Sequence, residues 1–204
     1  GAITVSLLSA VFLLTRHWQL EIPLQYLGRW LVSGDIHIPF GFLLDQASLL
    51  MLTIVTTISF LVQIYSLGYM AGDEGFSRYY AFMSLFAWAM MNLTIAPTLV
   101  QLFIFWELVG LSSYLLIGFW FNRNPDATIG DKNSQAAKKA FIANRVGDFG
   151  FLMAMFLTFW HFGSLTFAKV FMSVVDYSGP EWLIWAIAGF MLLGVTGKSA
   201  QIPL

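Results

Sequence analysis

The sequence contains no cysteine, few histidines and few charges among its 204 residues. Without cysteine, the chain cannot form a disulfide, hold an iron–sulfur cluster through thiolates or use a thiol in catalysis. His17, His37 and His161 are scattered, and no two of them have the spacing of a metal site. The net charge of −1 gives no basic surface for nucleic acid. These features predict a chain with no metal, no redox centre of its own and no nucleic-acid partner.

Charged residues make up 10% of the chain and hydrophobic residues 58%. A soluble domain has about 25% charged residues, so this chain has too few to cover a surface that faces water. We therefore expect the lipid bilayer to be its main solvent. In lipid every backbone N–H and C=O must be paired internally, which favours helices. The predicted fold class is all-α, a polytopic bundle of transmembrane helices.

A helix needs about 20 mostly apolar residues to cross a bilayer. Six segments reach or approach that length, and they are listed here by residue number: 2–14, 43–65, 79–95, 98–121, 139–160 and 181–204. We interpret residues 1–204 as a single membrane domain. The chain lacks an initiator Met, and its last residues follow an apolar segment directly. The expectation is therefore a piece of a longer protein, with 2–14 as a truncated membrane helix rather than a signal peptide.

Two connections between these segments are polar. Residues 16–41 contain two prolines, three glycines and short β-like pieces such as Ile36-His37-Ile38, which predicts an extramembrane loop with a β-hairpin. Residues 122–135 contain Pro125, Asp126 and Gly130 and are predicted to form an exposed loop.

Four charged residues lie inside the apolar segments: Glu107, Arg145, Asp148 and Lys198. A charge at the centre of a membrane helix costs about 2.5–3.5 kcal/mol on the insertion scale. We therefore expect these side chains to face the bundle interior, to pair with one another or to line water. Charges in such positions are functional candidates by default.

Arg145 and Asp148 are three residues apart, so they lie on adjacent turns of one helix face and can form an ion pair. Lys138 lies seven residues before Arg145, on nearly the same face, and extends the charges into a stripe. A salt bridge that only fixes helix packing explains the pair equally well.

Lys198 and Glu107 have no opposite charge within reach on their own helices, so each needs a partner from another helix. Burial disfavours the ammonium form of a lysine, whereas a nearby carboxylate favours it. A lysine balanced between these effects can take up and release a proton, as a relay requires. The alternative is a static Glu–Lys bridge, although Gly197, Ser199 and Gln201 suit a hydrated cavity better than a dry one.

Three stretches carry a resemblance to a known family: Phe105-Trp-Glu-Leu-Val-Gly-Leu-Ser-Ser-Tyr114, Lys139-Ala-Phe-Ile-Ala-Asn-Arg-Val-Gly-Asp-Phe-Gly150 and Gly197-Lys-Ser-Ala-Gln-Ile-Pro-Leu204. In residue identity, order and spacing they resemble the antiporter-like proton-pumping subunit L, or ND-five type, of respiratory complex I, NADH:quinone oxidoreductase. The chloroplast-type and cyanobacterial F subunits are very similar. The resemblance covers nearly the whole chain.

The resemblance implies a fold of inverted five-helix repeats with broken helices in the membrane. It implies that Glu107 and Lys198 are the coupled proton-transfer pair of a first half-channel. Arg145 and Asp148, with Lys139 and its neighbour Lys138, would be supporting charges. FMN, iron–sulfur clusters and quinone would be held by partner subunits of the membrane and peripheral arms, and this chain would carry no cofactor.

The function predicted from this resemblance is proton translocation coupled to quinone reduction, as a subunit of an enzyme complex in a bacterial plasma membrane or in an organellar inner or thylakoid membrane. Three alternatives stay open. The chain could serve a multi-subunit cation/proton antiporter, a ferredoxin- or hydrogenase-linked membrane complex, or a structural scaffold whose charges are static bridges.

Overall fold

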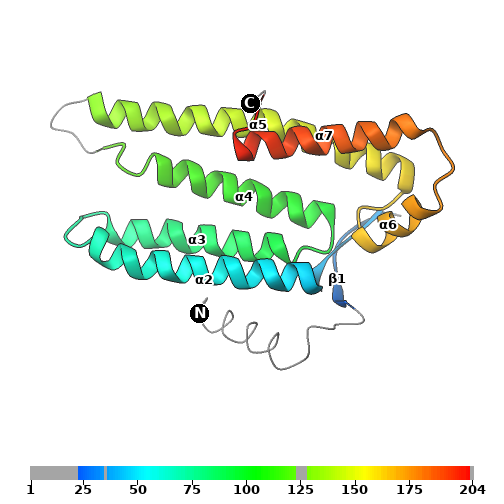
Figure 1. Cartoon of the computed structure of the whole chain (residues 1–204), viewed down its shortest axis with the longest axis horizontal. Helices are drawn as coiled ribbons and strands as arrows, with labels where there is room; N and C mark the ends of the chain where they lie inside the picture. Colours follow the sequence, from blue (N-terminus) through cyan, green and yellow to red (C-terminus); the bar gives the residue numbers. More distant parts are fainter. Residues whose placement is uncertain (1–22, 35, 123–127, 203–204) are drawn as a thin grey trace.

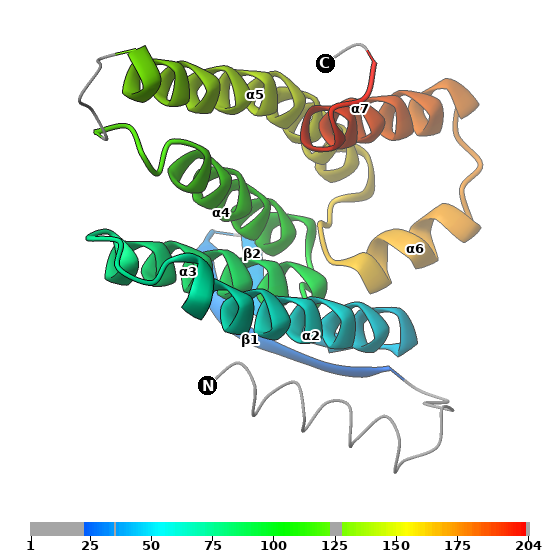
Figure 2. The ribbon, with the colours of Figure 1, turned by 60° about the vertical axis from the view of Figure 1, so that its left-hand side comes forward.

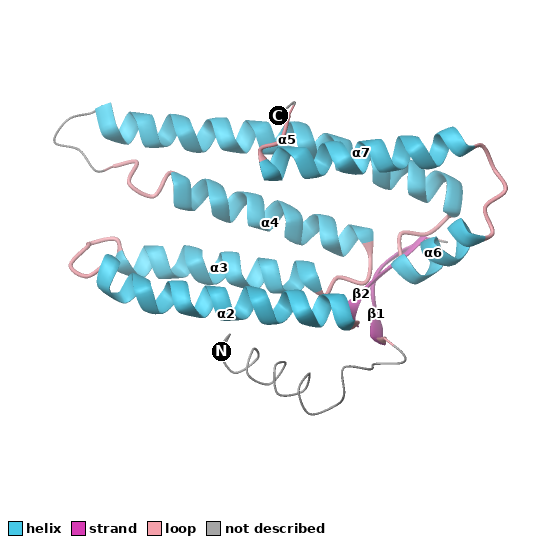
Figure 3. Ribbon diagram, viewed as in Figure 1, coloured by secondary structure: helices cyan, strands magenta, loops and turns pink. Residues whose placement is uncertain are grey.

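The computed structural model describes residues 23–34, 36–122 and 128–202, and this part of the chain is mostly helical (Figure 3). The elements in order are β1 (Leu24–Ser33), β2 (Ile36–Leu44), α2 (Gln46–Tyr69), α3 (Phe76–Thr94), α4 (Leu99–Ile117), α5 (Thr128–Phe162), α6 (Phe167–Val175) and α7 (Glu181–Ser199). The helix bundle expected from composition is confirmed. The predicted segment 2–14 lies outside the described residues.

The long helices run side by side along one axis, and neighbours in sequence pack on one another (Figure 1). Helix α3 packs on α2 and α4, α4 packs on α5, and α7 lies along the C-terminal half of α5 (Figure 2). The short helix α6 lies at one end of the bundle, the end at which the β-hairpin also lies. Helix α4 is therefore in the middle of the row, between α3 and the α5–α7 pair.

Within the described residues, four helices are long and apolar enough to cross a membrane: Gln46–Tyr69, Leu99–Ile117, Gly130–Phe162 and Glu181–Ser199. Helix α3 has a comparable length, but its serine, tyrosine, asparagine and arginine residues make it less apolar. We expected a span at 79–95, and the structure places a helix there whose composition alone does not mark it as one.

The polar stretch before the fifth segment is partly helical. Helix α5 begins at Thr128, so the loop predicted for 122–135 is wrong from residue 128 onward. Lysine, glutamine and alanine, which are good helix formers, dominate residues 132–139, and polarity does not oppose a helix outside lipid. The nine-residue helix α6 was not predicted, because it is too short to span and lies in a connection.

The predicted β-hairpin is present and extends to Leu44. Its strands pair antiparallel from Leu24 with Leu44 to Ser33 with Ile36. The hairpin is held to the bundle by Gln101 of α4, whose side chain accepts from the Gly41 N–H at 3.0 Å and donates to the Gly41 carbonyl at 2.9 Å.

Backbone hydrogen bonds fix the start of α4. The Leu99 N–H donates to the Leu165 carbonyl at 2.8 Å, and the Phe167 N–H donates to the Pro97 carbonyl at 3.1 Å. Thr98 caps the helix by accepting from the Gln101 N–H. The connection between α5 and α6 is therefore joined to the N-terminus of α4, which sets how far α4 extends along α5.

Helices α5 and α7 approach closely through glycines. A Cβ at Gly147 would lie 3.1 Å from the Gly194 carbonyl oxygen and 3.1 Å from the Gly197 Cα, so a side chain there would require the backbone of α7 to shift. Small residues at such contacts let membrane helices pack backbone to backbone. This contact with Gly197 places the last turn of α7 beside the charged part of α5.

Candidate functional site

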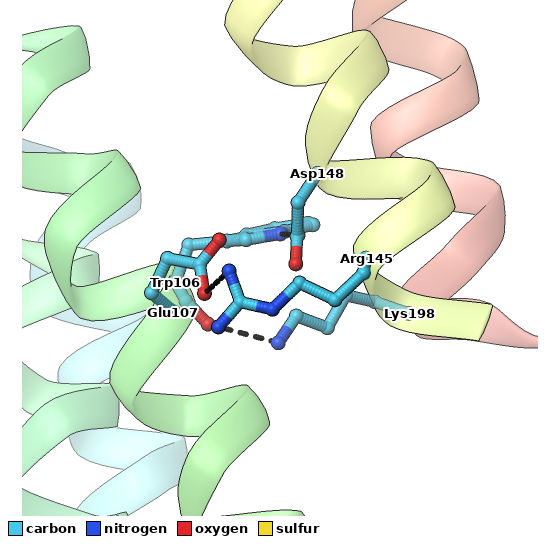
Figure 4. A network of polar contacts seen from close by, with 5 residues as sticks. All are labelled: Trp106, Glu107, Arg145, Asp148 and Lys198. Atoms are coloured by element: carbon cyan, nitrogen blue, oxygen red, sulfur yellow. Dashed lines mark hydrogen bonds and ion pairs between the residues drawn. The ribbon is translucent and has the colours of Figure 1, made fainter. Parts of the chain in front are cut away.

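The four charged residues of the apolar segments come together. Glu107 lies in the middle of α4, Arg145 and Asp148 lie on α5, and Lys198 lies in the last turn of α7. Their side chains converge in the space between α4 and the α5–α7 pair (Figure 4). Three helices thus supply two carboxylates and two cations to one place, as expected for charges that must avoid lipid.

The direct ion pair of this site joins Arg145 to Glu107. The Nη1 atom of Arg145 lies 2.6 Å from Oε2 of Glu107, and the guanidinium also lies over the Phe141 ring at 4.7 Å. The Glu107 side chain is 20% exposed and that of Arg145 51% exposed. The second carboxylate oxygen of Glu107, Oε1, is buried and has no hydrogen-bond partner among the described residues.

Asp148 is held by a tryptophan rather than by a cation. The indole Nε1–H of Trp106 donates to Oδ1 of Asp148 at 3.0 Å, and the Asp148 residue is 4% exposed. The ion pair predicted between Arg145 and Asp148 is wrong for this structure, since within the described ranges Arg145 pairs with Glu107. The long arginine side chain reaches across to α4, whereas the short aspartate stays close to α5 beside the indole.

Lys198 receives its partner from another helix, as expected, but the partner is not an acid. Its Nζ donates to the backbone carbonyl of Trp106 at 2.8 Å and lies 5.5 Å from the centre of the Trp106 ring. Helix α7 ends one residue later, at Ser199, and Ala200 adopts a left-handed conformation with φ of 50°. A cation in the last turn is favoured by the negative end of the helix dipole.

Lys138 and Lys139 lie on α5 but outside this cluster. Both side chains are exposed, and neither is in an ion pair within the part of the chain that the structure describes. Lys138 lies at the edge of a small apolar cavity of about 340 Å³ between α4 and α5, lined also by Leu111, Tyr114, Phe141 and Ile142. The stripe predicted from Lys138 to Arg145 therefore follows one helix without direct contact between its charges.

Trp106 is the member of the site that sequence reasoning missed. It contacts both Asp148 and Lys198, and its ring stacks on Phe151 at 5.7 Å. A signal was available, because an indole N–H inside an apolar helix needs an acceptor. Among the described residues, no group of three or more His, Cys, Asp or Glu side chains could hold a metal ion.

Comparison with known proteins assigns the chain to a family. A model described as "NADH:quinone oxidoreductase/Mrp antiporter, TM" matches residues 96–204, which include all four charged residues of the site. The chain belongs to this antiporter-like family of membrane subunits. A second model, "NADH-Ubiquinone oxidoreductase (complex I), chain 5 N-terminus", matches residues 30–80. The resemblance found in the motifs around Glu107 and Lys198 is confirmed.

Relatives in the antiporter-like family are considerably longer. The chain is 44% identical over 185 residues to the chloroplastic NAD(P)H-quinone oxidoreductase subunit 5 of Anthoceros angustus. This match covers 88% of the chain and 24% of that protein. It is 45% identical over 179 residues to NAD(P)H-quinone oxidoreductase chain 5 of Synechocystis sp.. This match covers 86% of the chain and 25% of that protein. The chain thus spans about a quarter of the length of the curated relatives that it matches.

A solved structure supports the antiporter-like fold. The Mrp complex from Dietzia sp. contains a chain that matches 99% of this one with a TM-score of 0.79 and 25% identity, over 21% of its own length. The row of helices α2 to α7 is therefore the arrangement found in this family. The roles of individual side chains rest on the geometry described above.

Proposed function

We propose that the chain provides a glutamate–lysine proton-transfer site in the membrane part of an NAD(P)H–quinone oxidoreductase. The observation that carries the proposal is the convergence of Glu107, Arg145, Asp148 and Lys198 from three helices of an apolar bundle. Their charges sum to zero as a group. A neutral cluster lowers the cost of placing each charge in lipid, and it can shift a proton without changing the total charge by more than one.

Lys198 is the proposed proton carrier and Glu107 the residue that controls it. In this structure Glu107 is bound by Arg145, and Lys198 donates to a neutral carbonyl. The ammonium form of a lysine is more stable when a carboxylate is close. Movement of Glu107 towards Lys198 would therefore load the lysine, and its return to Arg145 would release the proton.

Asp148 gives Arg145 an alternative partner. It lies three residues along α5, within reach of the same guanidinium. When Arg145 turns from Glu107 to Asp148, Glu107 becomes free to approach Lys198. The buried Oε1 of Glu107, which lacks a partner among the described residues, is the oxygen that could accept from the Lys198 ammonium when the carboxylate turns towards it.

The energy for this exchange must come from outside the chain. Moving one charge against 100 mV costs about 2.3 kcal/mol. We propose that partner subunits hold FMN, iron–sulfur clusters and quinone, and that quinone reduction there drives the switch. The relatives named above are chloroplastic and cyanobacterial, which supports a thylakoid or bacterial plasma membrane as the location.

The test is Lys198→Met in the intact complex, with Lys169→Met as the matched control. Lys169 is an exposed lysine of α6 outside the cluster. We expect Lys198→Met to lower the number of protons pumped per electron at least several-fold, and Lys169→Met to leave it unchanged. Normal pumping by the Lys198→Met complex at a normal rate of donor oxidation contradicts the proposal.

A cation/proton antiporter is the second candidate, because the Mrp complex from Dietzia sp. shares the fold at 25% identity. Exchange of Na⁺ or K⁺ for H⁺ in vesicles, without a redox donor, would favour it. Genes for peripheral NADH-binding and iron–sulfur subunits beside the gene for this chain would favour the oxidoreductase. A ferredoxin- or hydrogenase-linked complex shares the membrane site and differs in the electron donor, so donor oxidation assays on the purified complex separate it.

A further inference from the structure

The ammonium group of Lys198 lies directly against the backbone of α4. Its Nζ donates to the Trp106 carbonyl at 2.8 Å. In an α-helix this carbonyl already accepts from the N–H four residues later, which belongs to Gly110. A second donor can reach such an oxygen only where the side chains of the following turn leave it uncovered. The contact therefore depends on what occupies position 110.

Gly110 leaves that position open. A Cβ built there would lie 2.5 Å from Nζ of Lys198, which is too close for any real contact. Gly110 itself is buried, so the space beside it is filled by the lysine and not by solvent. An alanine at 110 would force the ammonium away from α4. The end of a lysine side chain is flexible enough to move without disturbing the helices.

Trp106 is held in place on two sides. Its indole N–H donates to Asp148 at 3.0 Å, and its ring stacks on Phe151 with an interplanar angle of 30°. The ring also lies 5.5 Å from Nζ of Lys198, within the range of a cation–π contact. Trp106 thus contacts the lysine through its carbonyl and its ring, and the carboxylate of α5 through its indole.

We propose that Trp106 and Gly110 form a seat for the Lys198 ammonium, which we call the lysine seat. Both are positioning residues, and the inference rests on the proton-transfer role proposed above for Lys198. When Glu107 is bound to Arg145, the seat holds the Lys198 ammonium through a neutral acceptor and not through an ion pair. That acceptor is the backbone carbonyl of Trp106, the residue before Glu107. A proton can then leave Lys198 without separating two opposite charges, while Glu107 stays with Arg145.

The experiment compares Gly110→Ala with Gly189→Ala in the intact complex. Gly189 lies on α7, and a Cβ there would meet nothing within 4 Å. The measured quantities are protons pumped per electron and the pH profile of pumping. Three other charged residues act on Lys198: Glu107 from α4, and Arg145 and Asp148 from α5. Neither variant alters these three residues.

Loss of a hydrogen bond from a charged group is enough to shift a protonation equilibrium by about one pH unit. Gly110→Ala should therefore move the pH profile of pumping by about one unit towards acid, because the ammonium loses its carbonyl acceptor. Gly189→Ala should leave the profile in place. Identical profiles for the two variants overturn the lysine seat.

Lys198→Met separates the seat from the function on which it rests. If Lys198→Met pumps normally, both proposals fail. If Lys198→Met stops pumping while Gly110→Ala and Gly189→Ala behave alike, the seat alone fails.

A measurement without a glycine variant covers the case in which Gly110→Ala does not assemble. Tryptophan labelled with ¹³C at its carbonyl is incorporated into the native complex, and infrared difference spectra are taken between resting and turning-over states. We expect a labelled carbonyl band that shifts in the native complex and is absent in Trp106→Phe, whose carbonyl at 106 carries no label. An unchanged labelled carbonyl band contradicts the seat.

Discussion

Arg145 reaches across from α5 to Glu107 on α4 at 2.6 Å, while Asp148, on its own helix one turn away, bonds to the Trp106 indole. The arginine therefore has two acids within reach and is bound to one of them. Such an arrangement has two alternative pairings, and both keep the charges of the cluster balanced. In the proposed mechanism, the choice of partner by Arg145 decides whether Glu107 is available to Lys198.

Arg145→Gln should uncouple Glu107 from α5. The hydrogen bond between Arg145 and Glu107 joins two charged groups. Loss of such a bond changes the equilibrium between the two positions of Glu107 by about ten-fold or more. We expect protons pumped per electron to fall by about that factor, measured by dye quenching in vesicles with donor oxidation followed in parallel. The double variant Glu107→Gln/Arg145→Gln should be no worse than Glu107→Gln alone, because the two side chains act through one contact. Additive losses would count against this coupling.

Trp106→Phe should release Asp148 while keeping an aromatic ring against Phe151. Without the indole N–H, the carboxylate of Asp148 becomes available to Arg145 three residues away. We expect a shorter Arg145–Asp148 distance in a structure of the variant and a several-fold loss of pumping. Trp185→Phe is the matched control, since Trp185 on α7 is 74% exposed. An Asp148 that stays apart from Arg145 in the variant would show that the indole does not hold it.

Gly147→Ala should separate α5 from α7. The new Cβ would lie 3.1 Å from backbone atoms of α7, which cannot move aside as a side chain can. Overpacking of this kind costs about 1–3 kcal/mol. We expect a lower unfolding temperature of the membrane part in detergent and less assembled complex. Gly189→Ala, with open space around the new methyl group, should unfold at the native temperature.

The sequence predicts the helices wherever their residues are apolar. Residues 43–65 and 98–121 are close to the observed α2 and α4, because Asp45 and Thr98 cap the starts of these helices. The start of α5 and the whole of α6 could not be predicted in this way. A helix that continues past an apolar run is determined by local propensity and packing, whereas α6 is apolar and amphipathic but too short to be recognised as a membrane span.

The sequence also predicts that Glu107, Arg145, Asp148 and Lys198 turn away from lipid, because charges inside apolar segments must face the bundle interior, pair with one another or line water. It does not predict which of them pair. Partner choice depends on how far α4 extends along α5 and on how closely α7 packs, and both are set by contacts distant in sequence. The Leu165–Leu99 backbone bond and the Gly147–Gly197 contact are examples.

Gln101 joins the β-hairpin to the helix that carries Glu107, and its replacement should loosen the hairpin. The Gln101 residue is 1% exposed, and its amide pairs with both the N–H and the carbonyl of Gly41. Gln101→Leu leaves both backbone groups without a partner, at a cost of about 1–3 kcal/mol for each buried group. We expect hydrogen exchange at the Gly41 amide to become at least ten-fold faster in the intact complex.

Two further variants separate the amide contacts from the burial of the side chain. Gln101→Glu can accept from the Gly41 N–H, and in its protonated form it can also donate to the Gly41 carbonyl, so its Gly41 amide should exchange more slowly than that of Gln101→Leu. Gln135→Leu alters an exposed glutamine on α5 and should leave the Gly41 amide at the native rate. Equal exchange in Gln101→Leu and Gln135→Leu would mean that the hairpin is held by its other contacts, such as the Leu43 N–H to Ile95 carbonyl bond of 2.8 Å.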